Sequence, residues 1–573
     1  MRVENAQKFK KFTGIALVAF YSLFHFGGSF AKEQTSHASL GFEFVENKAE
    51  LPLLNPSLQN RTFAKIRLTN GLRAYLISDP GADQSAAALA VEAGSWQDPS
   101  EYPGMAHFLE HMLFMGTKAY PKEHEYMQYI GDHGGIVNAA TWPDRTVYMF
   151  SINNPAFEGA LDRFSHFFID PLFSRSCIDR ELHAVDQEHA KNIENDPWRE
   201  YMIFKESGNP SHPNAAFSTG NAQTLSGIPQ AALQEWYERH YAADRMYLVI
   251  ISPLPLETLS SLVSQDFSKI KTSSIDKIPI TMPMASDKQK GHITYIKPIK
   301  DLKKLSLVWE IPEEFASDMD KKNAELIAYA LKNEGPNSLL EELKREKIAD
   351  ALDVEVDRFS LNEVLLRIDI SLTTQGLSQI ETATLRCFQA IAKFKQSGIP
   401  SYLFEEMKKL ATINYQYQSR EDAFSFVMRN AHDIVDEGLN TYPEKTLIPT
   451  TYDPISLKAF LEALTPQSCL FFLTADPASV AVHQPLTKEK WMGAEYVVKE
   501  IPPRTLLAWS DASPHPHIGL PLPNPFIPNN LLLVGKEDSV KNTPFLIAND
   551  DNGKVYFAQD HTYLVPELSA IFS

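Results

Sequence analysis

The sequence is poor in cysteine and in basic residues, and each shortage excludes a class of protein. Its 573 residues include only three cysteines, too few for a disulfide framework or a four-cysteine zinc site. Lysine and arginine number 54 against 72 aspartates and glutamates, which leaves a net charge of −18. Nucleic acid is therefore not expected as the main partner, because phosphate binding needs clustered Lys and Arg. The 17 histidines direct any metal hypothesis to histidine and carboxylate ligands.

Long apolar runs are missing beyond the first thirty residues, so no later segment is expected to span a membrane. The start of the chain has the three parts of a secretory signal: the basic stretch Lys8–Lys11, the apolar run Ile15–Phe24 and a small-x-small site at Ser29–Ala31. The alternative is an uncleaved membrane anchor, although the apolar run is short for a span. We expect residues 1–31 to be a signal peptide and the mature chain to function outside the cytoplasm, in the periplasm.

Two stretches without helical or strand periodicity divide the chain. Residues 272–291 are rich in Ser, Lys and Pro, which is typical of a linker. Residues 508–530 contain six prolines, which disfavour a helix and suit an extended connector. The last residues are too few for a core of their own and are interpreted as the truncated start of a third domain. The remaining divisions are an N-terminal extension, two large blocks and this C-terminal piece, at 32–60, 61–271, 292–507 and 531–573.

The two large blocks contain the same succession of elements, a strand followed by two helices. These elements are predicted at 147–152, 156–168 and 177–193 in the first block and at 364–371, 377–395 and 401–417 in the second. The first block also has an Asn-Gly pair at 70–71 between two alternating runs, which is a strong hairpin signal. We expect an α+β fold made of two tandem copies of one sandwich domain, each of about 220 residues. The alternative is two unrelated α+β domains.

The segment that carries the chemistry is HFLEH at 107–111, within a helix predicted over 103–115. His107 and His111 are four residues apart, so their imidazoles leave the same face of the helix, one turn apart. Two nitrogens at this spacing can bind one zinc ion. Glu110 flanks that face and can act as a general base toward water at the metal. The order is the inverse of the commoner zinc-peptidase motif; the alternative is two surface histidines on an ordinary helix.

Two histidines leave such a site incomplete, because a catalytic zinc has three protein ligands and one open position. Glu181 and Glu188 are candidates for the missing ligand. They are seven residues apart in the helix predicted over 177–193 and therefore share a face. One can bind the metal while the other orients a ligand from the surrounding shell, and the spacing does not decide between them. The alternative is an exposed acidic stripe.

A family resemblance is carried by three segments, GMAHFLEHMLFMG, HGGIVNAATWPDRTVY and RELHAVDQEHAKNIENDPW. They resemble the pitrilysin/insulysin metallopeptidases, the insulinase or inverted-zincin family. The resemblance runs from about Lys65 to the end of the chain and includes LKNEGPNSLLEELK and LPLPNPFIPNN. It implies the pitrilysin-like metallopeptidase fold, a peptidase activity and one Zn²⁺ per chain.

The resemblance also implies a role for each candidate residue of the metal site. His107, His111 and Glu188 match the zinc ligands of the family, and Glu110 matches its general base. Glu181 matches the acid of the surrounding shell, which resolves the ambiguity between the two glutamates.

Substrate contacts are implied in the same way. Asn138 and Ala139 match the edge strand that pairs with the substrate backbone, a form of β-augmentation. Trp198 and Tyr201 match aromatic positions lining the site, although aromatic residues at helical spacing usually face a core. The second block should keep the fold without the chemistry, because positions 293–431 contain no histidine. We expect it to be a wall and a secondary peptide-docking surface.

Full-length members of the family have four such domains in two halves, and the C-terminal half supplies an Arg and a Tyr that hold the scissile peptide. These two residues have no counterpart here. The expected partners are therefore peptide substrates and either a separate C-terminal half-chain or a second copy of this chain. The other interpretation is a truncated product.

The sequence thus predicts a zinc-dependent metalloendopeptidase that hydrolyses peptides or small proteins outside the cytoplasm. The alternative from another class is a non-catalytic or weakly active peptide-binding half-subunit. An ion-storage protein is disfavoured, because only one complete site is visible. Another divalent ion in place of zinc stays open, since sites of histidine and carboxylate accept several metals.

Overall fold

The computed structural model describes residues 41–273, 278–480, 482–531, 543–550 and 553–558. The predicted signal peptide lies outside these residues. In the part of the chain that the structure describes, no helix is both long enough and apolar enough to cross a bilayer.

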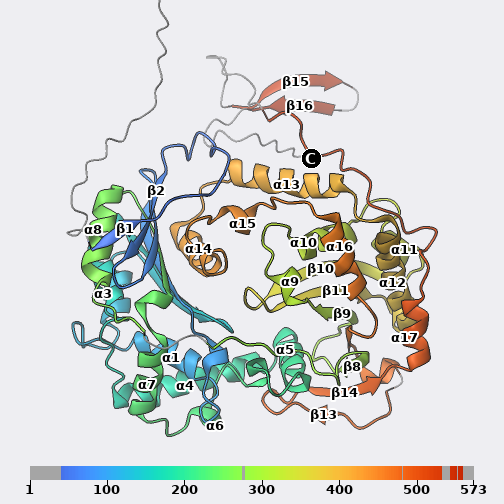
Figure 1. The fold of residues 1–573 in the computed structure, drawn as a ribbon, viewed down its shortest axis with the longest axis horizontal. Helices are drawn as coiled ribbons and strands as arrows, with labels where there is room; N and C mark the ends of the chain where they lie inside the picture. The colour runs from blue at the N-terminus through green and yellow to red at the C-terminus, as the bar shows by residue number, and fades with distance from the viewer. Residues whose placement is uncertain (1–40, 274–277, 481, 532–542, 551–552, 559–573) are drawn as a thin grey trace, which may run out of the picture. The chain divides into compact units, whose positions relative to one another are not determined.

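The first sheet has seven strands in the order β1-β2-β3-β7-β4-β6-β5 (Figure 1). β3 and β7 pair in parallel, and the other neighbours are antiparallel. The predicted Asn-Gly turn joins β2 to β3, and Gly71 there adopts a positive φ of 91°. The strands are β1 Phe42–Phe44, β2 Thr62–Leu68, β3 Arg73–Ser78, β4 Gln84–Val91, β5 Ile136–Thr141, β6 Thr146–Asn153 and β7 Met246–Ser252. The accompanying helices are α1 Met105–Leu113, α2 Glu125–Asp132, α3 Phe157–Ser165, α4 Arg175–Asn192, α5 Asp196–Ser207, α6 Ala222–Leu225, α7 Gln230–His240 and α8 Leu256–Phe267.

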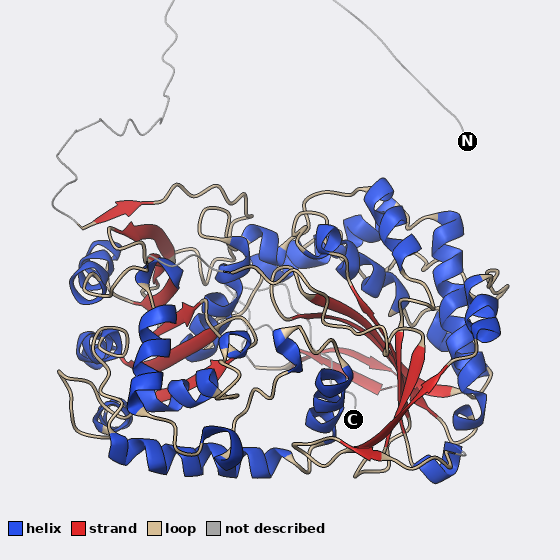
Figure 2. Cartoon of the chain, turned by 60° about the horizontal axis from the view of Figure 1, so that its bottom comes forward, coloured by secondary structure: helices blue, strands red, loops and turns tan. Residues whose placement is uncertain are grey.

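The second sheet also has seven strands, in the order β10-β11-β9-β12-β8-β14-β13. Figure 2 shows both sheets, with helices packed alongside each. The strands are β8 His292–Ile296, β9 Lys304–Glu310, β10 Ala349–Arg358, β11 Val364–Leu372, β12 Leu470–Thr474, β13 Thr487–Lys488 and β14 Glu495–Glu500. The helices are α9 Glu313–Ala316, α10 Asn323–Leu331, α11 Leu339–Arg345, α12 Ile380–Ser397, α13 Ser401–Gln416, α14 Ala423–Glu437, α15 Glu444–Leu447, α16 Pro454–Ala463 and α17 Pro503–Ser510. A separate hairpin follows, β15 Phe545–Asp550 and β16 Gly553–Phe557.

The two sheets repeat one topology. The five consecutive strands β3-β7-β4-β6-β5 of the first sheet correspond to β8-β12-β9-β11-β10 of the second, read from the opposite end of its order. In each set the first pair is parallel and the rest are antiparallel. The prediction of an α+β fold in which one topology occurs twice in tandem is confirmed.

Both faces of the central strands of the first sheet, β3, β7, β4 and β6, are buried, because helices cover each of them. Successive residues of β4 point to opposite sides. Leu89 belongs to the core beneath α1 and α8, whereas its neighbours Ala88 and Ala90 belong to a core beneath α14. The small alanine side chains leave room for a helix to lie close to the sheet.

The helix on this second face, α14, comes from the other half of the chain. Its apolar side contacts the sheet through Phe426, Val427, Ala431 and Ile434. Arg145, which is buried, ties α14 to the sheet by donating to Asp436 Oδ1 at 2.5 Å and to the His432 carbonyl at 2.5 Å. Loss of that guanidinium would leave buried carboxylates without a cation, which is costly in a protein interior.

Helix α5 makes the reciprocal contact. It follows α4 in the first repeat as α14 follows α13 in the second, and its Ile203 and Phe204 pack against Val308, Leu365 and Phe472 of the second sheet. The two repeats therefore exchange equivalent helices, a feature that the division of the sequence into blocks did not anticipate.

Candidate active site

Helix α1 turns its apolar side to the core and its histidines to a cavity. Met105, Phe108, Leu109 and Met112 are buried at positions that share one side of the helix. His107 and His111 lie on the other side, where their rings meet edge to face with centroids 4.9 Å apart. The i, i+4 spacing thus brings the two imidazoles together on one face of the helix, as helix geometry predicts.

A glycine allows a neighbouring segment to approach the start of α1. Gly104 has a φ of 95°, and a Cβ there would lie only 2.3 Å from Gly220 Cα. The close approach brings the carbonyl of Thr219 to the helix, where it accepts a hydrogen bond of 2.7 Å from His107 Nδ1. With Nδ1 donating, the Nε2 lone pair of His107 faces the cavity.

Glu188 of α4 lies opposite both imidazoles. Its Oε2 is 3.5 Å from His107 Nε2 and 3.7 Å from His111 Nε2. In a tetrahedral zinc site with bonds of 2.0–2.1 Å, two ligand atoms are about 3.3–3.4 Å apart. The two distances from Glu188 Oε2 are therefore close to the edges of such a site. The donor set of two imidazoles and one carboxylate suits zinc.

Glu181 contacts His111 on the side of the ring opposite Nε2. Its Oε2 is 3.3 Å from His111 Nδ1, the nitrogen that faces away from Glu188. A carboxylate in this position fixes the orientation and the tautomer of a ligating histidine. Thr219 and Glu181 thus play equivalent parts for His107 and His111.

The charges around the cluster favour an anionic Glu188. Hydrogen bonds with His107 and His111 hold the pKa of its carboxyl well below the usual range. Burial disfavours protonation of His111, but hydrogen bonds with Glu181 and Glu188 outweigh it and raise the His111 pKa to about 9. A metal ion here would replace that proton as the partner of the carboxylates.

Glu110 is buried next to the two histidines and shares with them a group of ligand-type atoms within 4.8 Å of one another. Its Oε2 accepts a hydrogen bond of 2.6 Å from the Thr141 hydroxyl. Burial raises the pKa of the Glu110 carboxyl, while His107 and Thr141 oppose the shift. A carboxylate whose pKa is raised toward the pH of its surroundings is suited to accepting and returning a proton.

The cluster opens onto a cavity of about 520 Å³. One side is the strand β5, which contributes Asn138 and Ala139 and forms the edge of the first sheet. Trp198, on α5, also lines the cavity, and this tryptophan is 38% exposed. An edge strand beside the metal cluster gives an extended peptide a place to pair.

Three family models match successive parts of the chain. They are insulinase (peptidase family M16) at residues 73–211, the peptidase M16 inactive domain at 227–410 and the middle or third domain of peptidase M16 at 415–573. The matched ranges take in most of the sequence. The chain belongs to the insulinase family of peptidases.

Individual relatives agree with this assignment. Insulin-degrading enzyme of Bos taurus is 32% identical over 525 residues, which cover 89% of this chain and 50% of that protein. Protease 3 of Escherichia coli O157:H7 is 31% identical, over 87% of this chain and 52% of that protein. The crystal structure of pitrilysin superposes with a TM-score of 0.81 at 30% identity, over 91% of this chain and 55% of that one. The chain thus spans about half the length of these insulinase-family relatives.

Tyr201, which the resemblance also places at the site, does not line the cavity. Its ring is stacked on Phe359 of the second repeat and on Phe204, and its hydroxyl donates to Asn214 Oδ1 at 3.2 Å. The reason is the helix exchange, since α5 turns this side chain to the second sheet while Trp198 stays at the cavity. Tyr201 supports the packing between the repeats.

Sequence reasoning did not find Thr219, Thr141 or Asp98. Thr219 acts through its carbonyl, which no side-chain pattern signals. Thr141 lies at the end of the strand that includes Asn138, but its partner Glu110 comes from a distant part of the chain. Asp98 precedes α1 by too many residues for an ordinary helix cap.

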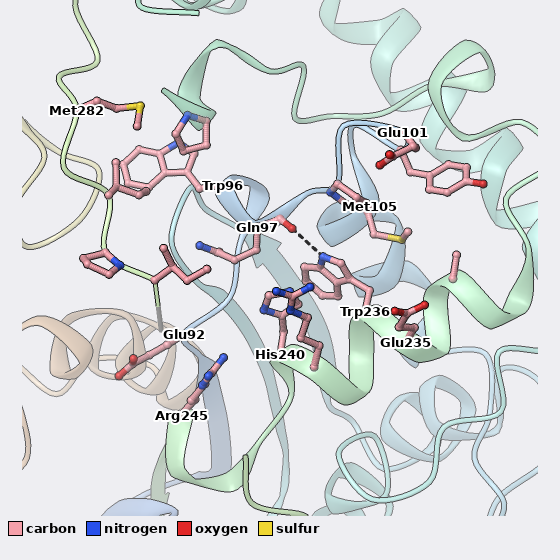
Figure 3. Close-up of a pocket in the computed structure, with 18 residues that line it drawn as sticks. Glu92, Trp96, Gln97, Glu101, Met105, Glu235, Trp236, His240, Arg245 and Met282 are labelled. Carbon is pink, nitrogen blue, oxygen red and sulfur yellow. Dashed lines mark hydrogen bonds between the residues drawn. The ribbon is translucent and has the colours of Figure 1, made fainter. Parts of the chain in front are cut away.

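A second cavity, of about 550 Å³, shares no lining residue with the first (Figure 3). Trp96, Met105 and Trp236 contribute to its walls, and Trp236 Nε1 donates to the Gln97 carbonyl at 2.9 Å. This bond ties α7 to the segment that precedes α1. Within the described ranges, the groups of potential metal ligands do not line this cavity.

Asp98 holds the start of helix α1. Its two carboxylate oxygens accept hydrogen bonds of 2.7 Å from the backbone N–H groups of Gly104 and Ala106. Burial raises the pKa of this carboxyl to about 7, although these N–H groups and Lys205 oppose the shift. Lys205 in turn donates to Ser218 Oγ at 2.8 Å, next to Thr219.

We expect Asp98→Ala to lower the free energy of unfolding by about 1–2 kcal/mol, the usual cost of removing a helix-capping side chain. Asp98→Asn should cost less, because the amide keeps one acceptor oxygen. Urea denaturation of the two variants measures the difference. Glu101→Ala, at an exposed position three residues away, is the control and should be neutral; an equal loss in Asp98→Ala and Glu101→Ala would contradict the capping role.

Proposed function

We propose that this chain is a zinc-dependent metalloendopeptidase that hydrolyses peptides or small proteins outside the cytoplasm. The observation that carries the proposal is the convergence of His107, His111 and Glu188 in a cavity beside Glu110. The insulinase family supplies the general class, a peptidase. The chemistry of the donor set supports zinc as the metal.

In this proposal His107, His111 and Glu188 hold the ion. A zinc ion bound there supplies Lewis-acid chemistry, which polarises water and carbonyl oxygens. Glu181 and the Thr219 carbonyl keep the two imidazoles in the tautomer that presents Nε2. One zinc per chain is the expected content of this site.

Glu110 is the proposed general base and acid. Its carboxylate takes a proton from the attacking water and then returns it to the amine that leaves when the peptide bond breaks. Burial excludes competing water from this carboxylate, and the Thr141 hydroxyl keeps Oε2 in one orientation. The other oxygen is thereby left for the proton transfers.

The substrate is proposed to bind as an added strand along β5. The free edge of this strand offers backbone groups at Asn138 and Ala139, close to the metal cluster. Pairing would fix the peptide in an extended form and stop it from sliding. Trp198 would contribute an apolar wall to the same cavity.

Partners and location complete the proposal. The residues that hold a scissile peptide from the other half of full-length relatives would come from a separate C-terminal half-chain or from a second copy of this chain. The signal-like pattern of the first thirty residues supports a periplasmic location. A weakly active peptide-binding half-subunit is the second candidate, and the cleavage assay distinguishes the two.

The test is a peptide-cleavage assay with metal analysis on the purified mature chain. We expect one zinc bound tightly at His107, His111 and Glu188, slow cleavage that a chelator abolishes and zinc restores, and a gain in kcat/KM of at least ~10-fold when the C-terminal half of a full-length relative is added. That gain corresponds to ~1.4 kcal/mol of transition-state binding. Cleavage that survives complete removal of metal would overturn the zinc mechanism. Zinc binding without any cleavage, with or without the added half, would favour the binding subunit.

A further inference from the structure

A second group of potential metal ligands lies in the other repeat, away from the cavity described above. It consists of Glu342 on α11 and of His515 and His517 on the proline-rich connector. His515 Nδ1 is 3.7 Å from Glu342 Oε1, and His517 Nδ1 is 3.6 Å from Glu342 Oε2. The donor set is again two imidazoles and one carboxylate.

The carboxylate of this group needs a cation. The Glu342 side chain is only 2% exposed, and a buried carboxylate without a positive partner is costly. The guanidinium of Arg345 provides the charge: its Nη2 contacts both oxygens of Glu342 and also His517 Nδ1. Three electron-pair donors thus converge on one cationic nitrogen.

Arg345 can leave this position at little cost. Its side chain is 51% exposed, so the guanidinium can move into water without uncovering a core. A divalent transition metal would offer the Glu342 carboxylate and the imidazoles of His515 and His517 more directional bonds, and imidazole nitrogen is among the preferred ligands of zinc, copper and nickel. The two distances run to different oxygens of Glu342, 3.7 Å to Oε1 and 3.6 Å to Oε2, so the carboxylate presents one oxygen to each imidazole.

We propose that Glu342, His515 and His517 form a second, structural site for a divalent transition metal, zinc foremost, which displaces the Arg345 guanidinium. The ion would fasten the connector to α11. The proposal does not depend on the peptidase function, because it uses none of the residues of the active-site cavity.

In the described residues, the connector contacts the second repeat at only a few other points near the two histidines, and a bound ion would add one more. Ile518 is buried against the second repeat, and the Gly519 N–H donates to the Asn337 carbonyl at 2.9 Å. Further on, Tyr402 donates to the Pro521 carbonyl. Pro516 limits the backbone between the two histidines, so both ligands are held together before an ion binds.

Zinc titration of the full mature chain tests the site. In a His107→Ala/His111→Ala background, which removes the first site, one zinc per chain should still bind. Adding His515→Ala/His517→Ala should abolish this binding, and adding Arg345→Ala should tighten it by at least ~10-fold, because the competing cation is gone. Absence of zinc binding in the His107→Ala/His111→Ala background would overturn the proposal.

Thermal unfolding of the variants in the same His107→Ala/His111→Ala background provides an independent measurement, since zinc at the first site would also raise Tm. Arg345→Ala leaves the Glu342 carboxylate unpaired and should lower Tm, and added zinc should restore Tm only while His515 and His517 are present. The matched control is Arg367→Ala, which breaks another ion pair of the same repeat, 2.6 Å from Arg367 Nη2 to Asp357 Oδ2, in a region without histidine; zinc should not restore its Tm.

Two outcomes would contradict the inference from unfolding. One is equal rescue by zinc with and without the histidines, which would mean that the ion binds elsewhere. The other is a complete lack of rescue, which would mean that Glu342 and Arg345 form an ion pair and nothing more. If Arg345→Ala does not fold, His515→Ala/His517→Ala keeps the ion pair intact; added to the His107→Ala/His111→Ala background, it should remove the rise of Tm with zinc that this background alone shows.

Discussion

Replacing Glu110 by Gln is expected to leave zinc bound and to slow peptide hydrolysis by ~10²–10⁴-fold, the usual contribution of a general base. The amide has nearly the shape of the carboxylate and can still accept the hydrogen bond from Thr141, so the local structure should persist. It cannot accept a proton from water, however. The measurement is kcat/KM for a peptide substrate together with the zinc content of the same sample.

The control for this variant is Glu257→Gln, the same chemical change at an exposed position of α8. It should keep both the parental rate and the parental zinc content. If Glu110→Gln also hydrolyses peptides at the parental rate, Glu110 is not the base. If it loses zinc, Glu110 is itself a ligand and the roles of Glu110 and Glu188 must be exchanged.

The parts of the site that could be predicted from sequence are those that local geometry determines. His107 and His111 share a face because an α-helix has 3.6 residues per turn, and the structure places their rings 4.9 Å apart. The same periodicity put Glu181 and Glu188 on one face of α4. It could not decide which of them faces the histidines, because that depends on how α4 packs against α1.

Contacts made across the fold were beyond sequence reasoning. The Thr219 carbonyl reaches His107 only because two glycines let the backbones meet. The exchange of α5 and α14 between the repeats places Tyr201 in a packed interface, although the family resemblance put both Trp198 and Tyr201 at the cavity. Such pairings depend on tertiary packing, which periodicity along one helix does not contain.

The repeat itself was readable from the order of strand and helices, since both blocks contain the same succession of elements. The second ligand group was not. The His-Pro-His run is visible at 515–517, but Glu342 lies far away in sequence and resembles any acid on an exposed helix. Its burial against the connector appears only in the folded chain.

Glu181 and Glu188 of α4 are expected to contribute differently to zinc binding. We expect Glu188→Gln to lower zinc affinity by more than ~100-fold, because a neutral amide is a poor substitute for an anionic ligand that faces both Nε2 atoms. Glu181→Gln should cost only ~10–100-fold, the usual effect of a group that orients a ligand. Competition with a zinc-binding dye measures both, in a His515→Ala/His517→Ala background so that the second group does not contribute.

Glu181→Gln and Glu188→Gln should also differ in whether a high concentration of zinc restores their activity. Glu181→Gln keeps an oxygen that can accept from His111 Nδ1, so His111 stays oriented and the variant should recover activity at high zinc. Glu188→Gln removes a ligand and should stay inactive even when zinc is forced in, since the ion would lack its third protein partner. Asp179→Asn, an exposed acid on the same helix, controls for the loss of one negative charge and should match the parent. Equal zinc affinities for Glu188→Gln and Glu181→Gln would show that the ligand assignment is wrong, whatever the fate of Glu110.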